Sequence, residues 1–166
     1  MKNLIVSLKA VVFCCVSTLF LMACDPCSGV VCNNGDCSNG SCVCFDGYQK
    51  TGTSCKGVNT LYVGSGNANA TQTTEDSSGT ILSTLSGIGL TLLADSTNPY
   101  NFSIIDFNNI AGNDVLFNIS STNYEIVLPT STPNYSVVGA RIGTQVQLDI
   151  TDASNITYKL AYTVNN

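Results

Sequence analysis

The apolar positions of this chain follow three different patterns along its length. Residues 10–23 form an uncharged, predominantly apolar run, preceded by Lys2 and Lys9. Residues 27–56 carry six closely spaced cysteines, and from residue 57 onward cysteine is absent while apolar and polar residues alternate. The three patterns predict three segments: a leader at 1–23, a disulfide module at 24–56 and a β domain at 57–166.

The alternation in the last segment predicts antiparallel β-strands that bury one face. Turn-forming residues separate the apolar runs roughly every eight to twelve positions, and no helical period occurs. The expected strands begin at Leu61 and continue at 80–85, 88–94, 100–104, 115–119, 124–128, 135–140, 146–150 and 156–164, and 71–79 is expected to be a loop. The predicted fold is an antiparallel sandwich or a small barrel. Eight strands in a closed barrel would leave an interior filled by side chains or holding one small ligand.

The leader has the features of a signal peptide. Its uncharged core at 10–23 fits the roughly 7–15 apolar residues of a signal peptide better than the roughly 20 of a spanning helix. Cys14 and Cys15 lie inside this core and Cys24 follows it. The other six cysteines imply three disulfides, which persist in an oxidising compartment. We therefore expect the protein to be exported.

The end of the leader, Leu21-Met22-Ala23-Cys24, resembles the lipobox of bacterial lipoproteins, in which Leu21 and Ala23 match. In that family the cysteine sulfur receives a diacylglycerol, and the new amino terminus is often acylated. The resemblance implies a lipid on Cys24 that anchors the protein in a bacterial cell envelope, at the outer membrane or cell surface rather than the inner membrane. The alternative is an ordinary cleavage site that leaves Cys24 as a reactive thiol.

The cysteine spacing resembles that of an EGF-like domain. A Cys-x-Cys step at 42–44 is followed by Phe45-Asp46-Gly47-Tyr48 and by Gly52 before the last cysteine. Spacing alone leaves the pairing open, and the resemblance implies the pairs Cys27–Cys37, Cys32–Cys42 and Cys44–Cys55. Asn39-Gly40 predicts a type I′ turn. Few apolar side chains are available for a core, so we expect the disulfides to hold this module together.

The β domain resembles, at the level of pattern, distantly lipocalin-like domains that follow an EGF-like head in some bacterial lipoproteins. The similarity lies in Ile105-Asp106-Phe107-Asn108-Asn109, in the Ile-Val-Leu-Pro step at 126–129 and in Gly139-Ala140-Arg141-Ile142-Gly143. This resemblance implies no catalytic chemistry.

Charge excludes one class of partner. Six Lys and Arg stand against eleven Asp and Glu, a net charge of −5, and removal of the leader takes away Lys2 and Lys9, which leaves 6 − 2 = 4 basic residues. An acidic protein repels phosphate backbones, so no nucleic-acid partner is expected.

The sequence offers little catalytic or metal-binding chemistry. It has no His, which excludes Ser-His-Asp and Cys-His nucleophile pairs. Glu75 and Glu125, the only glutamates, fit surface carboxylates better than a glycosidase pair. Asp149, Asp152 and Asn155 fit a turn better than a cation site. We expect a non-enzyme with no catalytic residue, metal or cofactor.

These observations favour a lipid-anchored envelope protein in which an EGF-like spacer presents a non-catalytic β domain for binding or adhesion. The candidate ligands are an extracellular protein or a glycan, contacted through exposed loops such as 71–79 and 131–134. One alternative is a carrier of small apolar ligands with a lipocalin-like pocket. Another is a secreted eukaryotic EGF-module protein, in which six Asn-x-Ser/Thr sequons would be glycosylated.

Overall fold

The chain forms two compact units. The computed structural model describes residues 26–128 and 134–165, so the leader and Cys24 lie outside the described residues. Of the described residues, unit 1 contains those up to Phe45 together with Lys50–Cys55, and unit 2 contains Asp46–Gln49 and those from Lys56 onward.

Unit 1 is built on short hairpins. Strands β1 (Gly35–Ser38) and β2 (Ser41–Cys44) pair antiparallel, with Ser38 opposite Ser41. The two residues between them, Asn39 and Gly40, have φ values of 50° and 76°, which are the positive values that a type I′ turn requires. Strands β3 (Tyr48–Thr51) and β4 (Ser54–Gly57) form a second two-stranded sheet, of which only Lys50, Thr51, Ser54 and Cys55 belong to unit 1.

Three disulfides replace a hydrophobic core in unit 1. They join Cys27 to Cys37, Cys32 to Cys42 and Cys44 to Cys55, which are the pairs expected from the cysteine resemblance. The apolar side chains of Val31, Val43 and Phe45 are exposed. Because these side chains gain little from burial, the crosslinks are the main source of stability, each typically contributing about 2–4 kcal/mol.

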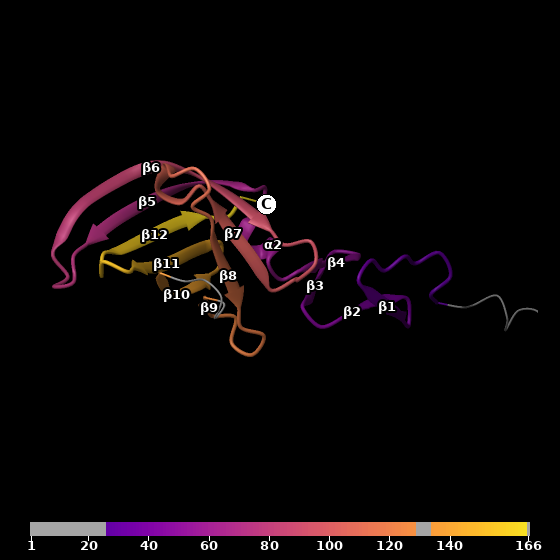
Figure 1. Ribbon diagram of the computed structural model, residues 1–166. Helices are drawn as coiled ribbons and strands as arrows, with labels where there is room; N and C mark the ends of the chain where they lie inside the picture. Colours follow the sequence, from indigo (N-terminus) through magenta and orange to yellow (C-terminus); the bar gives the residue numbers. More distant parts are fainter. Residues whose placement is uncertain (1–25, 129–133, 166) are drawn as a thin grey trace, which may run out of the picture. The chain divides into compact units, whose positions relative to one another are not determined.

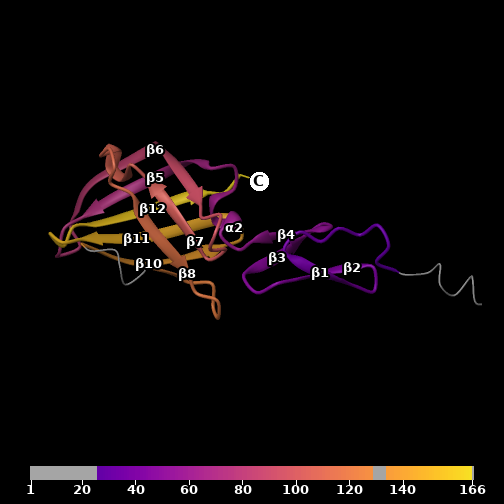
Figure 2. The same cartoon turned by 45° about the vertical axis from the view of Figure 1, so that its right-hand side comes forward.

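Unit 2 is a closed barrel of eight antiparallel strands, so the predicted β fold is confirmed and the choice between sandwich and barrel is settled (Figure 1). The strands are β5 (Asn67–Glu75), β6 (Ile81–Ala94), β7 (Asn101–Ile105), β8 (Val115–Ile119), β9 (Ile126–Val127), β10 (Tyr135–Ile142), β11 (Gln145–Asp152) and β12 (Thr157–Thr163). Their order around the barrel is β10-β11-β12-β5-β6-β7-β8-β9. Figure 2 shows β7 and β8 crossing the direction of β10–β12 steeply.

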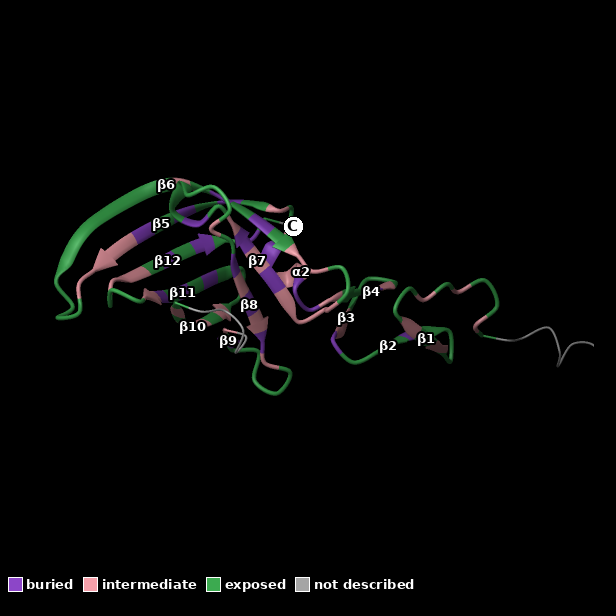
Figure 3. Cartoon of the chain, viewed as in Figure 1, coloured by how far each residue is buried: buried purple, intermediate pink, exposed green. Residues whose placement is uncertain are grey.

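Period-two alternation produces the core of the barrel. On β11, Val146, Leu148 and Ile150 point inward and are fully buried, while the residues between them are mostly exposed. Figure 3 shows the same alternation of buried and exposed positions along β12. Burying each aliphatic side chain contributes about 1.5–3 kcal/mol, and this burial fixes which face of each strand points inward.

The segment predicted to start the first strand is a helix. Leu61 and Val63 belong to helix α2 (Thr60–Val63), which ends at Gly64 with φ 57°. Three consecutive apolar residues are too few to distinguish a helical period from the alternation of a strand. The local backbone hydrogen bonds decide in favour of the helix. Tyr62 and Val63 are buried in the barrel core.

The β5–β6 hairpin also differs from its prediction. The expected loop 71–79 is largely strand, because β5 continues to Glu75, and the two expected runs at 80–85 and 88–94 form one strand of 14 residues. A bulge at Gly87, with φ 74°, lets β6 continue through the interruption in its apolar pattern. The pairing register shifts by one residue at this bulge, and β6 continues to pair with β5 on both sides of it.

The remaining strands lie close to their predicted positions, except for β9. Of the expected strand 124–128, only Ile126–Val127 is extended and paired. Tyr124 has φ 57°, a left-handed conformation that cannot continue a strand.

Candidate functional site

One end of the barrel is filled by aromatic side chains and helix α2. The rings of Tyr62, Phe102 and Phe117 stack in sequence, with centroids 5.8 and 4.9 Å apart. The Tyr62 hydroxyl donates to the carbonyl oxygen of Tyr124 (2.8 Å), and the Tyr162 hydroxyl donates to that of Tyr62 (3.0 Å). None of these aromatic side chains lines the pocket that opens elsewhere in the barrel.

At the other end a short 3₁₀ turn, η1 (Phe107–Asn109), inserts an aromatic ring into the barrel. Phe107 is buried and makes edge-to-face contacts with Tyr135 and Tyr158, with ring centroids 6.1 and 5.4 Å apart. Its backbone is fixed by Asn113, whose side-chain amide donates to the Phe107 carbonyl oxygen (3.1 Å) and whose own carbonyl accepts from the Phe107 N–H (2.8 Å). The turn is therefore anchored to the core.

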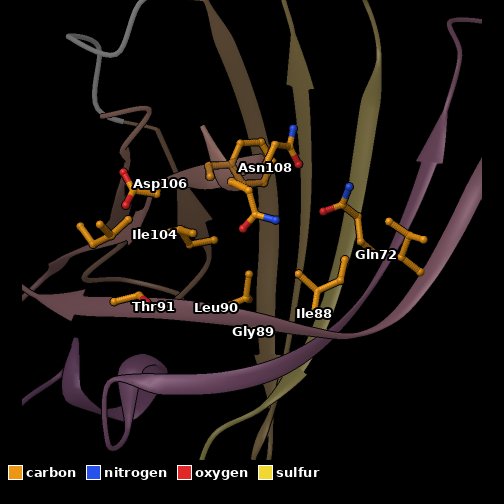
Figure 4. A pocket seen from close by; sticks show the side chains of 12 residues that line it. Gln72, Ile88, Gly89, Leu90, Thr91, Ile104, Asp106 and Asn108 are labelled. Carbon is orange, nitrogen blue, oxygen red and sulfur yellow. The ribbon is translucent and has the colours of Figure 1, made fainter. Parts of the chain in front are cut away.

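A pocket opens beside η1 because β6 and β7 pair over only part of their length. β6 pairs with β7 from Thr91 to Ala94, whereas among the described residues its first ten positions pair with β5 alone. The pocket has a volume of about 300 Å³ (Figure 4). Its apolar lining residues are Leu85, Ile88, Leu90, Ile104, Ile105 and Phe107, and the others are Gln72, Gly89, Thr91, Asp106, Asn108 and Asn109.

The strand register explains how β5 and β6 contribute to this lining. Gln72 lies opposite Leu85, and Ala70 lies opposite Ile88, so these side chains share the inner face of the sheet. Leu85 is nevertheless 53% exposed, because no strand of the described chain covers its far edge. The pocket therefore combines an apolar wall with access from outside.

Gln72 is the most unusual residue in the pocket. Its side chain points inward from β5 toward the pocket (Figure 4), and the residue is only 9% exposed. Its one hydrogen bond among the described residues runs from Nε2 to the Thr74 hydroxyl at 3.5 Å, the outer limit for such a bond. Its carbonyl oxygen has no partner among the described residues and is not among their fully buried unpaired atoms, so it is accessible from the pocket and can engage a bound molecule.

The charges around the pocket are few. No Lys or Arg lines it, and Asp106 is its single acidic residue. The Asp106 carboxylate accepts the Gly112 N–H at 2.7 Å, so one of its oxygen atoms already has a hydrogen-bond partner in the protein. The arrangement suits binding by hydrogen bonds and apolar contact.

The structure does not bring together the carboxylates that the sequence analysis considered as a glycosidase pair or as a cation site. Glu75 forms an ion pair with Lys159 (2.8 Å), while Glu125 precedes β9 in a separate loop. The Asp152 carboxylate accepts the N–H groups of Ser154 and Ile156, as turn residues do. Within 26–128 and 134–165, no three His, Cys, Asp or Glu residues cluster in a way that could hold a metal ion.

Of the two loops proposed for partner contact, the first is mostly strand, and the second lies largely outside the described residues. Most of 71–79 is strand β5, and only the turn after Glu75 remains a loop, with the Asp76 carboxylate accepting the N–H groups of Ser78 and Thr80. Residues 131–133 of the second loop lie outside the described residues.

The sequence prediction missed Gln72 because it lies within the segment assigned to a loop. A signal was present: Ala68, Ala70 and Gln72 occupy alternate positions and continue one face of a strand. A polar residue at the end of such an inward-facing series indicates an opening in the core.

No protein-family model matches this chain, and no curated protein matches it in sequence. In the described part of the chain, no helix has the length and apolar character needed to cross a membrane.

Proposed function

We propose that this protein is exported and held in a bacterial cell envelope, at the outer membrane or cell surface, by a lipid on Cys24. An EGF-like module would then act as the spacer that presents the barrel. The observation that carries this proposal is the order of segments along the chain. An apolar leader is followed by Cys24 and then, from Cys27 onward, by six cysteines joined in three disulfides. Two or three acyl chains anchor a protein stably, whereas a single chain does not.

The intact mass of the protein extracted from the membrane tests this proposal. We expect a chain that begins at Cys24, carries palmitate-type acyl chains and lacks six hydrogens because of the three disulfides. The Cys24→Ala variant should be released from the membrane fraction, while Cys14→Ala in the leader should not change its location. An unacylated, water-soluble product would contradict the tether, and glycans on the Asn-x-Ser/Thr sequons would support a secreted eukaryotic protein instead.

The barrel is proposed to be a non-catalytic binding domain for an extracellular protein or a glycan. A second candidate, carriage of a small molecule, is favoured by the pocket beside η1, because its apolar lining and access from outside suit a ligand. The rest of the barrel interior is filled by side chains such as Phe102, Phe117 and Leu148, so such a ligand would have to be small. Native mass spectrometry of the protein isolated from its own cells should then reveal a bound small molecule.

A further inference from the structure

The side chain of Gln72 presents an amide to the pocket without a good partner in the protein. Its carbonyl oxygen accepts no hydrogen bond from the described residues, and its amide nitrogen makes a single contact at 3.5 Å. Although the residue as a whole is nine-tenths buried, its oxygen is not among the fully buried unpaired atoms of the described residues, so it is open to the pocket and available to a bound molecule. A ligand group that both accepts and donates would complete this pairing.

The walls beside Gln72 fit a hydrocarbon body. Ile88 and Leu90 lie on β6, Ile104 lies on β7, and Phe107 forms the end wall. Figure 4 shows Gln72, Ile88 and Leu90 directed toward the same space from two neighbouring strands. The volume of about 300 Å³ lies at the lower end of the range for small-molecule sites.

The charges nearby disfavour an anionic head group. Beyond the leader the chain has four basic residues, and none of them lines the pocket. Arg141 lies over the Tyr62 ring, 5.9 Å from its centroid, and Lys159 is paired with Glu75. Asp106 adds a negative charge at the pocket, so a carboxylate or phosphate would be desolvated there without a counterion.

From this geometry we infer that the pocket binds an uncharged amphipathic molecule, with a short hydrocarbon body against β6, β7 and Phe107 and a hydrogen-bonding head group on Gln72. A primary amide is the simplest head group that matches the donors and acceptor of Gln72. This inference rests on the small-molecule function proposed above, and it adds the chemical class of the ligand and the residue that selects it.

Three probes that share one chain length test the inference: octanamide, octanoate and octylamine. Binding is measured by ligand-observed NMR and by shifts of the Gln72 side-chain amide. The protein is the full exported chain with Cys24→Ser, which keeps both units and all three disulfides. We expect octanamide to bind and octanoate to bind at least about tenfold more weakly, because it lacks a counterion. Octylamine should also bind more weakly than octanamide, because an ammonium has no acceptor for the Gln72 amide N–H and the Asp106 carboxylate already accepts the Gly112 N–H.

Substitutions assign the selectivity to Gln72. Gln72→Leu should weaken octanamide binding by about five- to tenfold, as expected for loss of one or two neutral hydrogen bonds. Gln72→Glu should reverse the order, so that octylamine binds most tightly. Gln147→Leu, on the exposed face of β11, is the matched control and should change nothing.

The outcomes separate the two levels of the proposal. If none of the probes binds at the pocket, both the carrier function and the ligand class fail. If octanoate or octylamine binds as well as octanamide, or if Gln72→Leu and Gln72→Glu bind octanamide like the unmodified protein, the pocket remains a binding site but the inference about its ligand is wrong.

Discussion

Asn59 is a buried polar residue that ties helix α2 to the loop between β6 and β7. Its side-chain nitrogen lies 2.9, 3.1 and 2.7 Å from the carbonyl oxygens of Asp95, Asn98 and Asn101. Its backbone N–H donates to the carbonyl oxygen of Pro99 (2.7 Å). One residue therefore satisfies several carbonyl groups at the filled end of the barrel, where water has little access.

Replacing Asn59 with Asp should destabilise the barrel by about 2–4 kcal/mol, because a carboxylate oxygen would then face carbonyl oxygens and lose its solvation. The measurement is chemical denaturation followed by tyrosine fluorescence. Asn69→Asp, on the exposed face of β5, is the control and should leave the free energy of unfolding nearly unchanged. Equal stability of the two variants would show that the Asn59 amide is not required.

Buried tyrosines make the barrel sensitive to alkaline pH. Burial raises the pKa of Tyr162, and the nearby Tyr62 hydroxyl raises it further. Burial also raises the pKa of Tyr62 and Tyr158. Because the pKa is raised only in the folded state, the unfolded chain ionises first, near its ordinary pKa of about 10.

The stability that these tyrosines contribute should therefore be complete below about pH 10 and decrease as the pH rises above it. The free energy of unfolding, measured by urea titration between about pH 8 and 11, should stay level up to about pH 10 and fall above it. Tyr162→Phe should lose some stability at the lower pH, through its lost hydrogen bond to Tyr62, but should show a shallower decline. A decline of equal slope in Tyr162→Phe would exclude Tyr162 as its source.

At the scale of the element, the bulge in β6 decides which of its side chains reach the pocket. Thr71 pairs with Ser86 and Ala70 pairs with Ile88, so Gly87 is the extra residue. Without it, either Leu85 or Ile88 would point to the outer face, since neighbouring strand residues alternate. The pocket thus depends on one residue with φ 74°.

Gly87 and Gly89 offer a matched test of this bulge. A Cβ atom at either position would meet no atom within 4 Å, but only Gly87 has a positive φ. Gly87→Val should therefore destabilise the barrel by about 1–3 kcal/mol through backbone strain. Gly89→Val should be neutral or slightly stabilising, because β-branched residues suit strands. Thermal unfolding monitored by circular dichroism distinguishes the two, and similar melting temperatures would mean that the bulge is not strained by a side chain.

The accuracy of the sequence prediction varied with the kind of signal that each element carries. The strand pair β11–β12 was predicted closely because Val146, Leu148 and Ile150 alternate strictly with polar residues. Asn39-Gly40 specified its turn because both positions need positive φ. In contrast, the polar residues of β5 resembled a loop, since their pairing with β6 and β12 depends on tertiary contacts that local composition does not encode.

The same limit applies to the pocket. Sequence alone indicated that an eight-stranded barrel could hold one small ligand. The position of the opening depends on how far β6 pairs with β7 and on the Asp106 and Asn108 backbones, both with positive φ. These features emerge only when the strands are assembled, so the alternation of Ala68, Ala70 and Gln72 could indicate an inward-facing polar residue but not the pocket that it lines.

At the scale of the whole molecule, the two units are stabilised by different means. The three disulfides all lie in unit 1, whose long apolar side chains are largely exposed. Unit 2 contains no disulfide among its described residues, and it holds the buried aliphatic and aromatic core. Six of the seven tyrosines lie in the barrel unit beyond residue 57, and only Tyr48 lies on strand β3, so tyrosine fluorescence reports mainly on the barrel.

Reduction of the disulfides should therefore unfold unit 1 and leave the barrel folded. After reduction and alkylation we expect the amide signals of 26–45 to collapse to unfolded positions in the NMR spectrum. The tyrosine-monitored denaturation midpoint should change little, because the barrel core does not depend on the crosslinks. If both units instead formed one cooperative structure, loss of three disulfides at about 2–4 kcal/mol each would lower that midpoint sharply or abolish the transition. A large shift would thus show that the barrel needs the disulfide module for its stability, and that the module is more than a spacer.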